Sequence, residues 1–209
     1  MTFNFIFLIV LINFFLFRIN KKVAKIFNLY DIPNDIRKLH KKPIPLNGGI
    51  FYFLNLFLIF IFDIFFNNFN LISVFGFSNE VKSILTLVVI LSLLLLGITD
   101  DKISLKPITK SLISMIIFFI FLSIAAEYLI IDLRFKTFNF ALDLFELSLV
   151  FTILCFMILQ IIMNMYDGIN LQSAAYYSVI LIHLMIVNQK YNFFIFCILT
   201  LIYLIYFSI

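Results

Sequence analysis

Long apolar stretches, separated by polar connections, run through the whole chain. Several are shorter than the roughly 20 residues that usually cross a bilayer, and those that begin at Leu112 and Ala174 are the weakest. The pattern predicts an all-α, polytopic integral membrane protein with about seven transmembrane helices, folded as a single transmembrane domain over residues 1–209. The predicted spans are Thr2–Phe17, Ile50–Phe66, Val81–Thr99, Leu112–Ala126, Leu147–Met163, Ala174–Val187 and Phe193–Ile209.

The composition indicates that lipid is the solvent of this chain. Hydrophobic residues make up 64% and charged residues 12%, whereas a soluble domain has about 45–50% apolar and about 25% charged residues. The mean hydropathy is +1.16. One soluble core could not bury this much apolar surface, so a soluble globular domain is excluded. Cys155 and Cys197 lie in separate apolar stretches and indicate neither a disulfide framework nor a metal site.

Lys and Arg are distributed unevenly between the connections. Eleven of the 15 fall in the connections that follow the first and third apolar stretches, or at their edges. Cytoplasmic connections are enriched in these residues, so we predict a multi-pass protein of the inner (plasma) membrane with both connections in the cytoplasm. The net charge of +4 then reflects a basic cytoplasmic face. We expect the lipid bilayer, and no nucleic acid, as a partner.

The first connection contains a cationic cluster between prolines, over residues 31–49. The prolines exclude one continuous helix. Arg37, Lys38 and His40 offer a forked cation, a point cation and a titratable ring, a set that suits a diphosphate. Gly48 and Gly49 allow left-handed geometry and a close backbone approach. The alternative is a basic cluster that only sets topology or contacts anionic lipid.

The second motif, over residues 96–110, begins where the third apolar stretch ends. Asp100 and Asp101 are adjacent carboxylates at a predicted membrane surface, and such a pair can hold a divalent cation against phosphate oxygens. Pro107 is predicted to start the next helix. Lys110 would lie one turn into that helix, where it could reach a phosphate or only extend to the membrane interface. The alternative for the acids is that they simply end a span.

The third motif, over residues 164–170, follows the fifth apolar stretch. Asn164 and Asp167 are three residues apart and share a helix face if the helix continues that far. An amide and a carboxylate together can bind a base edge, a sugar hydroxyl or a cation. The alternative is an ordinary helix end capped by Gly168. All three motifs are predicted on the cytoplasmic side.

In this order and spacing, the motifs resemble the polyprenyl-phosphate N-acetylhexosamine-1-phosphate transferases. This membrane family includes the enzymes that start O-antigen and teichoic-acid synthesis and the peptidoglycan translocase. The matching patterns are Asp31-x-Pro33, Arg37-Lys38-x-His40, Pro43-x-Pro45, Gly48-Gly49, Gly97-x-x-Asp100-Asp101 and Asn164-x-x-Asp167-Gly168.

The resemblance implies transfer of N-acetylhexosamine-1-phosphate from a UDP-N-acetylhexosamine to undecaprenyl phosphate, with release of UMP, at the start of cell-envelope glycan synthesis such as that of lipopolysaccharide O-antigen. Mg²⁺ or Mn²⁺ would be the cofactor. Asp100, Asp101 and Asp167 are the expected catalytic residues and metal ligands. The expected substrate-binding residues are Arg37, Lys38, His40, Gly48, Gly49, Lys110 and Asn164.

Some features depart from this family. Asn170 stands where the family usually has a second Asp, and the family's later Gly-Asp-x-Gly-Ser stretch and His-rich loop do not occur in the sequence. We therefore expect a chain shortened at its C-terminal side relative to the family. The alternative function is a non-catalytic or half-enzyme chain that binds UDP-sugar or lipid phosphate and needs a second chain. A homodimer and a complementing C-terminal chain both stay open as partners.

Overall fold

The computed structural model describes residues 2–32, 43–66, 80–135, 137, 140–166, 172–187 and 197–204, and these residues are mostly helical. Within them, three helices are long and apolar enough to cross a membrane: Val81–Ile103, Pro107–Ile124 and Phe145–Ile162. Two shorter apolar helices cover Gly48–Phe62 and Ala174–Val187. A mostly helical fold with candidate membrane-spanning helices is therefore confirmed, while the count of seven spans stays a prediction.

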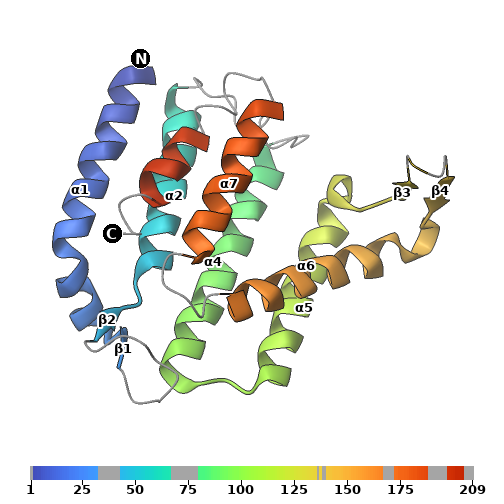
Figure 1. Ribbon diagram of the computed structural model, residues 1–209, viewed down its shortest axis with the longest axis horizontal. Coiled ribbons are helices and arrows are strands. Elements are labelled where there is room, and N and C mark those ends of the chain that lie inside the picture. The colour runs from blue at the N-terminus through green and yellow to red at the C-terminus, as the bar shows by residue number, and fades with distance from the viewer. Residues whose placement is uncertain are drawn as a thin grey trace. The chain divides into compact units, whose positions relative to one another are not determined.

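The chain divides into two compact units, one over Met1–Ser78 with Leu171–Ile209 and one over Asn79–Asn170. The elements of the first unit are α1 (Thr2–Phe27), β1 (Tyr30–Asp31), β2 (Ile44–Pro45), α2 (Gly48–Phe66), α7 (Gln172–Val187) and a helical segment over residues 197–204 (Figure 1). The expectation of a single transmembrane domain stays a prediction.

The first helix is longer than predicted. α1 ends at Phe27, ten residues beyond the predicted end at Phe17, so Arg18 and Lys21–Lys25 are helical and do not belong to the first connection. The apolar run ends at Arg18, but Lys and Arg are good helix formers whose long stems keep the charge in water while the backbone continues. The Arg18 guanidinium lies 4.9 Å from the centre of the Phe14 ring, one turn earlier.

A short two-stranded ladder closes the first connection. α1 ends before Asn28, which adopts a left-handed φ of 53°. β1 and β2 then pair antiparallel, with Tyr30 opposite Pro45 and Asp31 opposite Ile44. This pairing holds the two ends of the connection together directly before α2 begins at Gly48.

Two asparagines join α1 to α2 inside apolar surroundings. Asn13 is 0% exposed and Asn55 4% exposed. Their amides exchange hydrogen bonds, with Asn13 Nδ2 donating to Asn55 Oδ1 at 2.8 Å and Asn55 Nδ2 donating to Asn13 Oδ1 at 3.0 Å. Each amide also donates to the carbonyl one turn earlier, Ile9 O and Phe51 O. All four amide protons are therefore used.

The second unit is built around three helices, α4 (Glu80–Ile103), α5 (Pro107–Ile124) and α6 (Ser148–Tyr166). The connection from α5 to α6 contains η1 (Ala126–Tyr128), β3 (Asp132–Phe135), β4 (Phe140–Asp143) and η3 (Phe145–Leu147). Figure 1 shows α6 crossing α5, with the hairpin of β3 and β4 at the far end of the connection. The sequence pattern did not predict this hairpin, which pairs Asp132 with Asp143 and Phe135 with Phe140.

The core of the second unit lies where α5 meets α6. Phe118, Phe121, Leu122, Ala125 and Ile153 are buried together, with side chains of α4 packed against them. The Phe118 ring stacks on that of Phe156 at 5.1 Å. At the end where α4 begins, Lys82 pairs with Glu127 at 2.5 Å, so the start of α4 and the end of α5 lie together. The site residues of this unit are at the opposite end.

Candidate functional site

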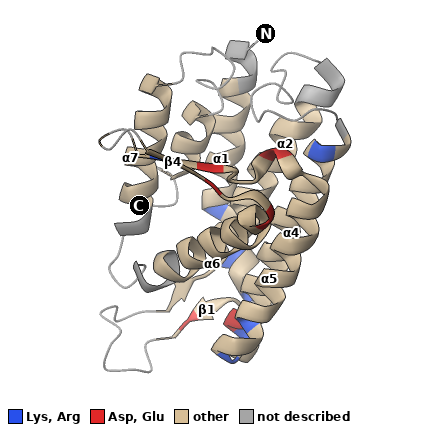
Figure 2. Cartoon of the chain, turned by 90° about the vertical axis from the view of Figure 1, so that its right-hand side faces the viewer, with Lys and Arg blue, Asp and Glu red and all other residues tan. Residues whose placement is uncertain are grey.

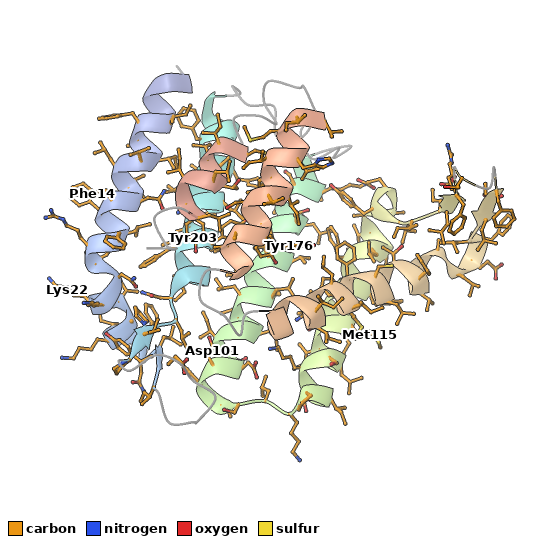
Figure 3. The ribbon with its side chains drawn as sticks, viewed as in Figure 1. Phe14, Lys22, Asp101, Met115, Tyr176 and Tyr203 are labelled. Carbon is orange, nitrogen blue, oxygen red and sulfur yellow. The ribbon has the colours of Figure 1, made fainter. Side chains whose placement is uncertain are left out.

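The paired acids lie in the last turn of α4. The helix continues to Ile103, four residues beyond the predicted end at Thr99, so Asp100 and Asp101 are helical and do not follow the helix end. Ser104, with a left-handed φ of 53°, ends the helix, and its amide donates to the Asp100 carbonyl at 2.8 Å. Asp101 is exposed near the end of the helix, as Figure 3 shows.

Asp100 is held by two groups that follow it in the chain. Its Oδ1 accepts a hydrogen bond from the Leu105 amide at 3.1 Å, and its Oδ2 accepts one from Lys110 Nζ at 2.6 Å. Both side chains of this ion pair are 23% exposed. Figure 2 shows the acidic and basic residues together at this end of α4 and α5. The ion pair thus fixes the turn between the two helices.

The start of α5 was predicted correctly. Pro107 occupies the first helical position, and Lys106 before it has extended backbone angles of −62° and 140°. Proline fits there because its missing amide proton would have no helical partner. Lys110 then lies one turn into the helix. The sequence left open whether Lys110 reaches a phosphate or the membrane interface, and the structure shows it bound to Asp100.

A small pocket lies between α5 and α6 beside this ion pair. Its empty volume is about 260 Å³, part of it open to solvent. The residues that line it are Lys110, Ser111, Ser114, Met157, Gln160 and Ile161. Ser114 is 1% exposed, and its hydroxyl donates to the Lys110 carbonyl at 2.9 Å. Only about 30 Å³ of this space can hold the centre of a water-sized group, whereas ligand pockets commonly measure about 300–1,000 Å³, so the pocket has room for one small group such as an ammonium.

Gln160 is a candidate residue that the motif analysis missed. It is the fourth residue before Asn164, which in turn is three before Asp167. Residues at these spacings share one helix face, and this polar spacing within an apolar stretch could have indicated Gln160. α6 includes the backbone of Asn164. Gln160 lines the same pocket as Lys110, so α6 meets the first turns of α5 at this residue.

The other predicted site residues are only partly described. Arg37, Lys38, His40 and Asp167 lie outside the described residues, as does the side chain of Asn164. Gly48 and Gly49 form the first turn of α2, in the first unit, and have helical and not left-handed geometry. The Gly48 carbonyl accepts a hydrogen bond from the Tyr203 hydroxyl at 2.5 Å. The structure therefore brings together Asp100 and Lys110, and convergence of all three motifs stays a prediction.

The acids at the end of α4 are suited to a divalent cation. In the described part of the chain no three His, Cys, Asp or Glu side chains form a metal-binding group. Mg²⁺, however, is usually held by one or two carboxylates together with water and substrate phosphates. A cation already lies against Asp100, namely the Lys110 ammonium. Asp100 and Asp101 thus fit a metal site that the substrate completes.

The long apolar helices indicate a membrane protein, and a cluster of acidic and basic residues lies at the end of one of them. Residues 83–209 match the model of glycosyl transferase family 4, so the chain belongs to this family. The matched range contains the paired acids, Lys110, Gln160 and residues 164–170, and it begins after the cationic cluster of residues 31–49. No curated protein and no solved structure matched the chain.

Proposed function

We propose that this protein transfers a sugar 1-phosphate, in the form of N-acetylhexosamine-1-phosphate, from a UDP-sugar to undecaprenyl phosphate. The reaction would release UMP and start the synthesis of a cell-envelope glycan, such as lipopolysaccharide O-antigen, at the cytoplasmic face of the inner membrane. The observation that carries this proposal is the pair of acids at the end of α4, bound to Lys110 at the start of α5, in a chain of glycosyl transferase family 4.

The reaction exchanges one phosphate ester for another. An oxygen of the lipid phosphate attacks the β-phosphorus of the UDP-sugar, and the bond from that phosphorus to the bridging oxygen breaks, so the electron pair leaves with UMP. A phosphate monoester has its second pKa near 6, so the attacking oxygen is mostly deprotonated at neutral pH. A general base is therefore not required, and positioning and charge neutralisation are the main tasks of the protein.

The residues of the chain divide these tasks between them. Asp100 and Asp101, with Asp167, would hold Mg²⁺ or Mn²⁺, which when bound offsets negative charge on the diphosphate. Lys110 would add positive charge beside it. Arg37, Lys38 and His40 would bind phosphate oxygens, and Asn164 would position the nucleotide. The apolar surface of the helices would keep the lipid acceptor in the bilayer.

Turnover in isolated membranes tests this proposal. Membranes that contain the full chain, supplied with Mg²⁺, undecaprenyl phosphate and UDP-N-acetylglucosamine, should release UMP and form a lipid-linked product. Replacing both acids, Asp100→Asn with Asp101→Asn, should lower the rate by at least about 100-fold, since electrostatic contacts of this kind are commonly worth that much.

A matched control removes carboxylates elsewhere in the same unit. Asp132→Asn with Asp143→Asn changes two acids of the β3–β4 hairpin and should leave turnover within about twofold, because surface changes away from the site are usually small. Equal activity of the Asp100/Asp101 variant and the wild type would refute the site. Binding of UDP-N-acetylglucosamine without UMP release would instead favour the non-catalytic alternative.

A further inference from the structure

Gln160 is a polar group that the proposed chemistry does not use. Its side chain lines the pocket between α5 and α6, on a helix that is otherwise apolar at this level. Its amide forms no hydrogen bond with the described part of the chain. Its carbonyl can therefore accept a hydrogen bond from a donor that enters the pocket.

Lys110 is the side chain whose ammonium can enter this pocket. It pairs with Asp100 and also lines the pocket with Gln160. The Ser111 and Ser114 hydroxyls donate to backbone carbonyls, which leaves lone pairs on both oxygens. Together with the Gln160 carbonyl, these oxygens could accept the three protons of an ammonium. No carboxylate is among the described lining residues, so an ammonium placed there would keep its charge uncompensated.

The geometry points to two alternative positions for the Lys110 ammonium. In one position, which the structure shows, the Lys110 ammonium pairs with Asp100. When a divalent cation binds Asp100, the ammonium moves into the pocket between α5 and α6, where Gln160 accepts it and acts as a positioning residue. This inference rests on the proposed function, because it assumes that Asp100 is a metal ligand during turnover.

The surroundings support such an exchange. The lysine side chain has four rotatable bonds, and Met157 and Ile161 offer apolar surface for its stem. Asp100 stays oriented when Lys110 leaves, because the Leu105 amide still donates to its other oxygen. The displaced ammonium, whose protons are taken by neutral oxygens, would keep its positive charge near the metal and attract a phosphate through that charge. Metal binding would thereby prepare the site for the anionic substrates.

Direct measurement of metal affinity tests the exchange without any turnover. The purified full chain in lipid nanodiscs is titrated with Mn²⁺ and the free ion is followed by electron paramagnetic resonance. Lys110→Met removes the competing cation and should lower the Kd about fivefold, as expected for an ion pair of modest strength. Gln160→Leu removes the receiving group and should raise the Kd about threefold. Lys106→Met, at a lysine outside the pocket, should change the Kd less than twofold.

The decisive comparison is the double variant. In the Lys110→Met background, Gln160→Leu should leave the Kd unchanged, because no ammonium remains to be received. Gln160→Glu should change the Kd in the opposite direction from Gln160→Leu. A carboxylate in the pocket should hold Lys110 there and so lower the Kd for Mn²⁺. Adding Lys110→Met should largely remove this gain in affinity. A misfolded variant cannot produce tighter binding.

Two results would overturn the exchange while the proposed function stands. One is a Gln160→Leu variant that binds Mn²⁺ as the wild type does, which would mean that Gln160 does not receive the ammonium. The other is an equal loss of affinity with and without Lys110, which would mean that Gln160 does not act through the lysine. If no form of the chain binds Mn²⁺, the exchange and the metal-dependent function are both refuted.

Discussion

The buried asparagine pair between α1 and α2 offers a sharp test of how the first unit is held together. Asn13→Leu or Asn55→Leu removes both hydrogen bonds between the side chains, at 2.8 and 3.0 Å. Hydrogen bonds between membrane helices are worth about 0.6 kcal/mol on average and at most about 1.7 kcal/mol. Two of them therefore contribute about 1–3 kcal/mol.

A single replacement also leaves the other asparagine without a partner. That group keeps its bond to its own helix, such as Asn55 Nδ2 to Phe51 O, but its carbonyl and one N–H lose theirs. An unsatisfied buried group adds about 1 kcal/mol or more, so each single variant should lose about 2–4 kcal/mol of unfolding free energy. The double leucine variant leaves no amide unpaired and should lose clearly less than the sum of the two.

Unfolding in mixed detergent micelles with increasing dodecyl sulfate measures these differences. Far-ultraviolet circular dichroism is a suitable signal, because the chain has no Trp. Asn20→Leu is a matched control on the same helix, since the buried Asn20 Oδ1 has no partner within the described residues. It should cost much less than Asn13→Leu. Additive losses at Asn13 and Asn55, with no coupling in the double-mutant cycle, would refute the reasoning.

Two further predictions concern the second unit. No atom lies within 4 Å of a Cβ built on Gly97, so Gly97→Ala should raise the unfolding free energy by about 0.5–1 kcal/mol; a fall in the same unfolding assay would contradict this. Burial, with a smaller effect of Glu127, raises the pKa of Tyr128 from 10.0 to about 12. The protonated phenol is thus favoured in the folded state, so its contribution is complete below pH 10 and is lost as the pH rises through 12. The difference in absorbance at 295 nm between wild type and Tyr128→Phe should titrate near pH 12, and a midpoint near 10 would refute the shift.

The sequence predicted those features that depend on a local mechanism. Pro107 marks the start of α5 because a proline fits only the first turn of a helix. The predicted end of α1 was wrong. Hydropathy detects where the apolar run ends, at Phe17, whereas the helix ends where its backbone hydrogen bonding ends, at Phe27. The β3–β4 hairpin was missed because its strands are four residues long, too short for a clear alternating pattern.

The contacts of the site depend on geometry that spacing alone does not contain. Asp100 and Lys110 are ten residues apart, and they meet because the chain turns at Ser104, whose φ is 53°. No propensity of serine predicts that backbone angle. The spacing of Gln160 from Asn164 indicates only a shared helix face, whereas its place beside Lys110 follows from how α6 packs on α5.

The position of the two acids favours a functional reading over a structural one. Carboxylates in the last turn of a helix face the negative end of its dipole, which is unfavourable by about 0.3–1 kcal/mol for each exposed group. α4 carries both Asp100 and Asp101 there, although Asn or Lys at these positions would suit the helix better. Lys110 offsets this cost at Asp100, where its ammonium forms an ion pair. Two acids placed against the preference of their own helix are consistent with the proposed cation site, and Asp100→Asn with Asp101→Asn should therefore lower metal affinity without lowering the unfolding free energy of the second unit.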